Sequence, residues 1–249
     1  MKITKRILFV FLISIFSTTI FAGEVFKVAV INSFPFGYKD SQGKLTGTHW
    51  NYWQEISKAS GIEMELTLTP KKRILKNAKE GKIDGFIMFH SKSRDSYIKG
   101  VNIIRPIKVV ALSRKGLKIN SYDDLYQHKA IGVFRGTKVT KKFDSDSGLM
   151  KSEKNSYDTM VKMLGAKRLD SIIGNSIVLS SLVNEFGLKN EVQFPPLVLS
   201  EKAQWLQIPM KSTYISEVSN FNKIIQKLKS DGTFDKILTN HVGEGWQKF

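Results

Sequence analysis

Cysteine is absent from all 249 residues of the sequence, and this absence narrows the possible functions at once. Without cysteine the chain cannot use a disulfide scaffold, a thiol nucleophile or a zinc site with cysteine ligands. It also lacks the lipidated cysteine that ties many exported proteins to a membrane. If this protein leaves the cytoplasm, it must be retained in another way.

Acidic residues are scarce, since 22 Asp and Glu stand against 39 Lys and Arg and give a formal net charge of +17. The first 22 residues hold three basic residues and no acidic one, which leaves +14 for the rest of the chain. The basic residues are spread thinly, and the longest run of them is 71–73. This dispersion favours a solvated basic surface with a preference for anionic solutes, and we expect no nucleic-acid partner.

A long apolar run occurs only in the first 22 residues, which have the three parts of a secretory signal. Basic residues come first, the apolar stretch 7–16 follows, and the small residue Ala22 ends the segment. An uncleaved membrane anchor is the alternative, but the stretch is short for a span of about 20 apolar residues. We predict that residues 1–22 are a cleaved signal peptide. Because no lipidated cysteine follows, the predicted location is the periplasm, enclosed by an outer membrane.

Motifs for metal, phosphate or nucleophilic chemistry are missing as well. The histidines lack the spacing of metal ligands; they are His49, His90, His128 and His241. No glycine-rich loop ends in the lysine–serine pair of a P-loop, and no serine occupies a nucleophile elbow. We therefore expect no metal and no cofactor.

Strand-like and helix-like patterns alternate along most of the chain. The predicted strands are 24–31, 62–68, 82–89, 129–134, 169–173, 192–199 and 202–210. The predicted helices are 48–60, 71–81, one capped by Thr137, 157–168, 175–187, 215–232 and 233–242. This rhythm predicts an α/β fold with mainly parallel sheets flanked by helices.

The rhythm occurs twice, which predicts two lobes joined by extended crossings near 106–112 and 194–199. Residues 23–108 and 197–249 are assigned to lobe 1, and residues 109–196 to lobe 2. A cleft between two such lobes is a common place for a small ligand.

Two polar residues stand where a ligand contact is expected in such a fold. In open α/β sheets the ligand lies at the carboxyl ends of the strands. Arg94 follows the predicted strand 82–89, and Thr137 follows the predicted strand 129–134. Both are therefore candidate ligand contacts, and His90 beside the first of them is a weaker one.

Segments along nearly the whole chain resemble the bacterial extracellular solute-binding proteins of family 3, the polar amino-acid type of periplasmic binding protein. The segments, in order, are FPFGYKDSQGKLTG, EISKASG, AKEGKIDGFI, SKSRDSYI, IGVFRGT, AKRLDSII and LKSDGTFDKIL. No single segment is decisive, but their order and spacing make a chance likeness improbable. The resemblance implies a two-lobed fold of type II that closes on its ligand. It also implies that the protein is a monomer and delivers the ligand to the permease of an ABC transporter.

The resemblance also implies roles for individual residues. An arginine at the place of Arg94 binds the α-carboxylate of the ligand, which its planar guanidinium matches well. The threonine of the GT pair, here Thr137, adds hydrogen bonds. Aromatic residues cover the ligand's side chain, and the candidates are Phe34, Phe36 and Trp50.

Three departures from the family pattern bear on the ligand. Asn175 stands where amino-acid-binding members have an aspartate for the α-ammonium, so a charge that neutralises the amine is lost. The serine-rich turn before the arginine is shortened, and Ser91 is a candidate substitute. Arg73 lies where it can bring a second cation into the cleft. An anionic or carboxylate-bearing ligand without a free amine is therefore favoured, although an amino acid stays possible.

Other interpretations remain open for the residues and for the function. Arg94 can be a surface residue paired with Asp95 or Asp84, Thr137 and Asn175 can be helix caps, and Trp50 can belong to a core. The same fold can serve as a sensing module for a membrane receptor. It can also carry a dehydratase or lyase, for which Glu55 and Asp84 are the carboxylates to consider, although no enzyme activity is expected.

Overall fold

The computed structural model describes residues 24–249, so the predicted signal peptide, residues 1–22, lies outside the described residues. The strands are β1 (Phe26–Ile31), β2 (Tyr38–Lys39), β3 (Leu45–Thr46), β4 (Met64–Thr69), β5 (Phe86–Phe89), β6 (Ile98–Ser113), β7 (Ile131–Phe134), β8 (Lys151–Lys154), β9 (Ser171–Asn175) and β10 (Leu197–Pro209). The helices are α1 (Thr48–Ser60), α2 (Lys71–Glu80), α3 (Lys141–Ser145), α4 (Tyr157–Gly165), α5 (Ser176–Glu185), α6 (Val218–Ser230) and α7 (Thr233–Val242). Short 3₁₀ helices are η1 (Lys92–Arg94), η2 (Tyr122–Gln127), η3 (Lys189–Glu191), η4 (Ile215–Glu217) and η5 (Trp246–Lys248).

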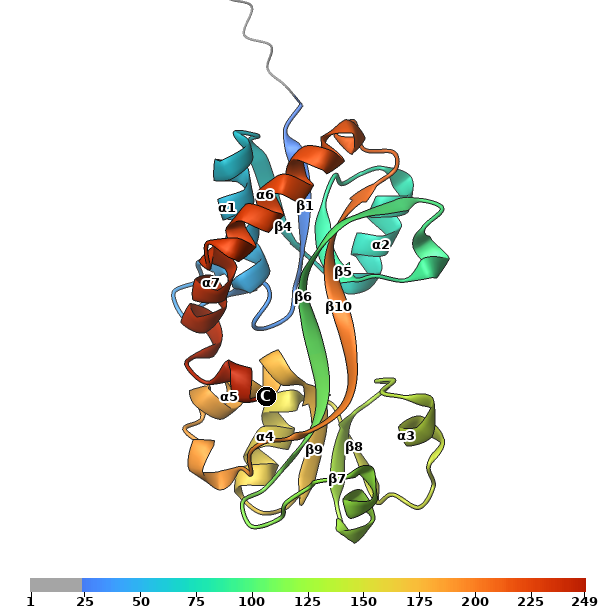
Figure 1. Ribbon diagram of the computed structural model, residues 1–249, viewed down its shortest axis with the longest axis vertical. Coiled ribbons are helices and arrows are strands. Elements are labelled where there is room, and N and C mark those ends of the chain that lie inside the picture. The colour runs from blue at the N-terminus through green and yellow to red at the C-terminus, as the bar shows by residue number, and fades with distance from the viewer. Residues whose placement is uncertain (1–23) are drawn as a thin grey trace, which may run out of the picture.

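Two lobes are connected by two long strands that run side by side (Figure 1). In the upper lobe of the figure, β1 pairs in parallel with β4, and an isolated parallel bridge joins Val28 to Gly85 just before β5. In the lower lobe, β7 pairs in parallel with both β8 and β9. The long strands β6 and β10 are antiparallel to each other and extend into both lobes. Each lobe therefore has parallel strands, and the connection adds antiparallel ones.

Two helices of the upper lobe, α1 and α2, begin where the sequence predicts and end within one residue of the predicted position. In α1 the buried residues, among them Tyr52, Trp53 and Ile56, lie on one face and pack against the sheet. The helices α1 and α2 both end at a glycine in the left-handed conformation, Gly61 (φ 70°) and Gly81 (φ 74°). Glycine adopts this conformation without a Cβ penalty, so each helix ends sharply.

Several predicted boundaries are wrong. The extended segments 192–199 and 202–210 are replaced by one continuous strand, β10. The helix expected after Thr137 begins instead at Lys141, where the Thr140 hydroxyl accepts a hydrogen bond from the Phe143 amide at 3.1 Å. Thr137 is therefore not a helix cap. The polar strand β8 was not predicted, because its sequence KSEK lacks an apolar pattern.

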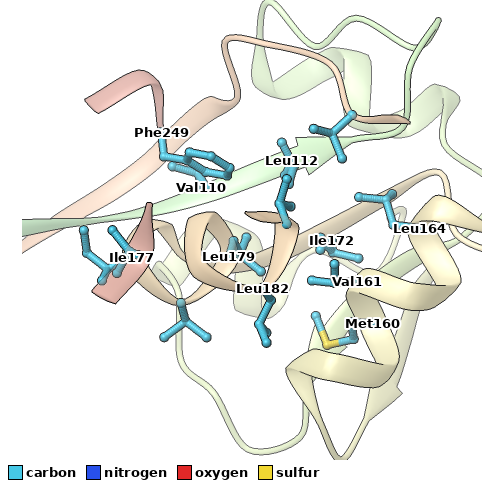
Figure 2. Packing of buried hydrophobic residues seen from close by; sticks show 14 of the residues in the cluster. Val110, Leu112, Met160, Val161, Leu164, Ile172, Ile177, Leu179, Leu182 and Phe249 are labelled. Atoms are coloured by element: carbon cyan, nitrogen blue, oxygen red, sulfur yellow. The ribbon is translucent and has the colours of Figure 1, made fainter. Parts of the chain in front are cut away.

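Hydrophobic residues of both lobes meet in one cluster (Figure 2). Its centre is the core of the lower lobe, formed by residues such as Val110, Leu112, Leu179 and Leu182. Phe249, at the end of the segment that follows α7, is 6% exposed and belongs to the same cluster. The chain after α7 thus reaches from the upper lobe to α5 in the lower one (Figure 1).

Hydrogen bonds hold the end of α7 and the segment after it against the lower lobe. Ser181 Oγ on α5 donates to the His241 carbonyl at 3.3 Å, and the Asn184 side-chain amide donates to the Val242 carbonyl. Lys108 Nζ on β6 donates to a Phe249 carbonyl oxygen at 3.2 Å. The lobes are therefore in contact outside the two long strands.

The predicted lobe boundaries, 108/109 and 196/197, fall inside β6 and just before β10, and they remain a prediction. Among residues 24–249, no helix combines the length and the apolar character that a membrane crossing requires.

Candidate ligand-binding site

A cavity of about 350 Å³, called the main cavity below, lies at the end of β5 and is lined by residues of both lobes. Its apolar wall comes from β1, β5 and the loop between β1 and β2, and consists of Ile31, Phe36, Ile87, Met88 and Phe89. Its polar wall comes from α1, α2, η1, β9 and β10, and consists of His49, Lys71, His90, Ser91, Arg94, Asn175, Lys202 and Gln204. A volume of this size suits a small solute.

Arg94 reaches this cavity because the buried strand β5 ends at Phe89 and the chain turns at once into η1. The guanidinium Nη2 donates to the Phe89 carbonyl, which fixes the side chain across the end of the strand. Arg94 Nε is buried and has no hydrogen-bond partner among the described residues. The geometry leaves guanidinium donors for an anion in the cavity.

The alternative partners considered for Arg94 are engaged elsewhere. The Asp95 carboxylate lies 2.8 Å from His90 Nε2. The Asp84 carboxylate accepts from the Lys27 amide at 2.9 Å and from the Ser212 hydroxyl at 2.6 Å. The arginine is therefore not part of a surface ion pair in the described part of the chain.

Asn175 stands at the end of β9 and caps α5. Its Oδ1 accepts hydrogen bonds from the backbone amides of Ile177 at 2.9 Å and Val178 at 3.3 Å. Both acceptor positions of the side-chain oxygen are thereby used. The amide group that remains toward the cavity is a donor, which suits an anionic ligand better than an ammonium group. Asn175 thus lines the cavity and caps the helix at once.

His49 supplies a neutral polar group inside the cavity. The residue lies on α1 and is 2% exposed, and its ring packs on that of Phe36 in a tilted arrangement with centroids 4.6 Å apart. Its Nε2 lies 3.4 Å from Gln204 Oε1. Burial lowers the pKa of His49 to about 3, so the imidazole is uncharged near neutral pH.

Thr137 lies apart from Arg94 in this structure. It is exposed in the turn after β7 and lines a second cavity, of about 340 Å³, within the lower lobe. Its amide donates to the Phe134 carbonyl at 3.0 Å, and the Phe134 ring stacks on Tyr157 with centroids 5.1 Å apart. The structure brings Arg94 together with Asn175 but not with Thr137.

The aromatic candidates also separate. Phe36 lines the cavity. Phe34 instead packs on Tyr38, with ring centroids 4.9 Å apart, and faces the groove beside α7. Trp50 packs against the core of the upper lobe. Of the three, Phe36 is the one positioned to cover a ligand.

Of the two remaining candidates, Ser91 lies at the cavity and Arg73 does not. Ser91 lines the cavity, and its hydroxyl lies 2.9 Å from that of Ser93. Arg73 is exposed on the first turn of α2 and does not line the cavity, whereas Lys71 on the same turn does. Lys71, and not the predicted Arg73, is therefore the cation of this turn that lines the cavity.

Sequence reasoning missed four polar residues of the cavity: His49, Lys71, Lys202 and Gln204. The run of basic residues at 71–73 was a usable signal for Lys71. The other three lie on α1 and β10, far from Arg94 in the sequence, and no local pattern distinguishes them.

Neither catalytic carboxylate that the sequence suggested lines the cavity. Glu55 forms an ion pair with Lys58 at 2.7 Å on the surface of α1, and Asp84 is held by Lys27 and Ser212. In residues 24–249 no group of three or more His, Asp or Glu side chains could hold a metal ion.

The sequence matches the family model of the bacterial extracellular solute-binding proteins, family 3, over residues 26–244. The chain belongs to this family. The predicted membership is therefore confirmed, and the family is one of binding proteins found outside the cytoplasm.

Known proteins support this assignment across the chain. A Neisseria gonorrhoeae protein named "Probable histidine-binding protein" is 25% identical over 236 residues, which cover 90% of this chain and 86% of the relative. The second substrate-binding domain of Lactococcus lactis GlnP, in its open conformation, matches with a TM-score of 0.73 at 17% identity, covering 89% of this chain and 96% of that one. An ancestral cationic amino acid solute-binding protein also reaches 0.73, at 19% identity, with 88% and 95% covered. These structures confirm the predicted two-lobed, type II fold.

Proposed function

We propose that this protein captures a small carboxylate-bearing solute between its two lobes in the periplasm and delivers it to an ABC-type transporter. The observation that carries the proposal is Arg94, whose guanidinium lines the main cavity with no carboxylate partner in residues 24–249. A planar guanidinium binds a carboxylate through two parallel hydrogen bonds. Ser91 and Asn175 stand beside it as further hydrogen-bonding groups.

The cavity lacks the acidic partner that the ammonium group of an amino acid requires. The Neisseria relative is named for histidine, and such a ligand carries an ammonium group. No Asp or Glu lines the main cavity of this chain, and the oxygen of Asn175 is used by the helix cap. A ligand that depends on an ammonium partner is therefore disfavoured, and an acid that is held by its carboxylate is favoured.

Capture requires that ligand contacts bridge the lobes, because a ligand stabilises closure only through differential contacts in the closed state. Arg94 belongs to the upper lobe, while Asn175 and Thr137 belong to the lower one. We propose that bending of β6 and β10 brings the lower lobe, with Thr137, toward the ligand at Arg94.

The proposal predicts that Arg94→Ala strongly weakens the binding of small carboxylates. Removing one partner of a charge-assisted hydrogen-bonded pair typically costs about 2–5 kcal/mol, which is a loss of roughly 30-fold or more. Thermal-shift screening against amino acids, keto acids and dicarboxylates would find the ligand, and calorimetric titration would compare the variants. Folding is checked by the melting temperature without ligand.

A matched control is Lys92→Ala, which removes an exposed cation from the same 3₁₀ turn. It should leave the affinity nearly unchanged. The assignment of Arg94 would be wrong if both variants bound as tightly as the parent protein. Delivery is tested by uptake of the labelled ligand in cells that lack the gene, complemented with either variant; uptake that did not depend on the gene would contradict a transport role.

A further inference from the structure

Three cations and no acid line the main cavity. Lys71 comes from the start of α2, Arg94 from η1 and Lys202 from β10. None of the three forms an ion pair with a carboxylate of residues 24–249. The other polar residues of the lining, such as His49 and Gln204, are neutral at pH 7 or lack a negative charge.

A single carboxylate cannot satisfy this arrangement. It occupies the guanidinium of Arg94 through two hydrogen bonds, and the two lysines that line the same cavity are then left without an anion. Like charges that line one cavity repel each other, and the repulsion grows as closure excludes water. A second negative charge on the ligand relieves it.

The first turn of α2 provides an independent sign of anion binding. It contains Lys71, Lys72 and Arg73 and no acidic residue. Basic residues at a helix N-terminus oppose the helix dipole, which destabilises the helix unless an anion binds there. Residues that destabilise their own helix or strand are expected at functional sites, where binding requires them.

The second cavity, in the lower lobe, is the other place from which a carboxylate could reach the ligand on closure. The acids that line this cavity are Asp144 and Glu153. Asp144 accepts a hydrogen bond from the Val139 amide at 3.0 Å, and Glu153 lies 3.3 Å from Arg135. Both are already engaged in contacts within their own lobe.

We infer that the ligand carries two negative charges: a small dicarboxylate, with one carboxylate on Arg94 and the other between Lys71 and Lys202. This inference rests on the proposed function and makes it specific. His49, Gln204 and Asn175 then fix the body of the ligand by uncharged hydrogen bonds, and Phe36 covers it.

The test compares each dicarboxylate with its own monoamide, which keeps the shape and removes one charge. Calorimetric titration of the purified protein would use malonate, succinate, glutarate and adipate together with their monoamides. At least one diacid is expected to bind about tenfold more tightly than its monoamide. The proposal is wrong if no diacid binds at millimolar concentration, or if every diacid and its monoamide bind equally.

Substitutions locate the second charge. Lys71→Gln and Lys202→Gln should each weaken the diacid by about three- to tenfold while hardly changing the monoamide, so the ratio between them falls. Lys72→Gln is the matched control, because this exposed cation shares the first turn of α2 but does not line the cavity. An unchanged ratio in both lysine variants would overturn the assignment.

The two proposals fail in different ways. If the parent protein binds diacid and monoamide equally and Arg94→Ala weakens both, the proposed function stands and the dianion proposal falls. If a ligand is bound independently of Arg94, the proposed function itself falls.

Discussion

At the scale of single residues, His49 is a buried histidine that the fold keeps uncharged. Burial lowers its pKa from 6.5 to about 3, so between these values the unfolded chain binds a proton that the folded protein does not. The contribution of His49 to stability is therefore complete above pH 6.5 and is lost as the pH falls through that value toward 3. From pH 7 to pH 5 the loss is about 2 kcal/mol.

The prediction is that His49→Gln, which stays neutral at every pH, flattens the pH dependence of unfolding by about this amount. Urea titrations of both proteins at pH 7 and pH 5, without ligand, measure it. His128 and His241 also have pKa values lowered by burial and are present in both proteins, so the difference between the two isolates His49. Identical pH dependence in the two proteins would contradict a neutral, buried His49.

The residue scale also shows which part of the site a sequence can reveal. Arg94 follows a buried strand directly, so strand and arginine were recognisable within one short segment. Lys202 and Gln204 enter the same cavity only because β10 pairs with β5 and β6 from a distant part of the chain. Pairing of that kind is decided by tertiary packing, and no local pattern records it.

At the scale of elements, the junction of β9 and α5 joins helix stability to ligand choice through Asn175. Asn175→Ala removes the acceptor for the amides of Ile177 and Val178, and it should lower the free energy of unfolding by about 1 kcal/mol. Asn175→Asp keeps the cap, since aspartate is an equally good N-cap residue, and should leave stability nearly unchanged.

The two variants should differ in binding as well as in stability. The aspartate places a negative charge in a cavity lined by cations, so it should weaken an anionic ligand and favour one with an ammonium group. Chemical denaturation and titration with matched acids and amino acids measure both effects. The role of Asn175 as a helix cap would be wrong if Asn175→Ala and Asn175→Asp destabilised the protein equally. The predicted electrostatic effect on binding would be wrong if Asn175→Asp left the ligand preference unchanged.

Element prediction succeeded where the periodicity was strong and failed where it was weak. The helices α1 and α2 have apolar residues at helical spacing and a glycine stop, and their ends were predicted closely. The strand β8 is short and polar, and it is held by pairing with β7. For β10, the sequence showed two extended segments, but the residues between them, Ser200 and Glu201, continue the ladder with β6 through a local bulge.

At the scale of the whole molecule, the sequence indicated two lobes but gave no sign that the last residues would connect them. A two-lobed fold follows from the repeated strand–helix rhythm. The position of Phe249 depends instead on a pocket formed by Val110 and its neighbours on the lower lobe (Figure 2). Such a contact appears only when the complete fold is assembled.

Phe249 is positioned to couple the unfolding of the two lobes. Its ring lies 5.0 Å from that of Phe194, measured between centroids, and it packs in the cluster that also contains Leu238 and Val242 of α7. We predict that Phe249→Ala lowers the free energy of unfolding by about 3 kcal/mol, because truncating a buried phenylalanine leaves a cavity. The loss should also reduce the coupling between lobes, so that calorimetry resolves two transitions or one broadened transition. Gln247→Ala, at an exposed position in the same segment, is the control and should unfold like the parent protein; equal behaviour of the two variants would show that the segment does not couple the lobes.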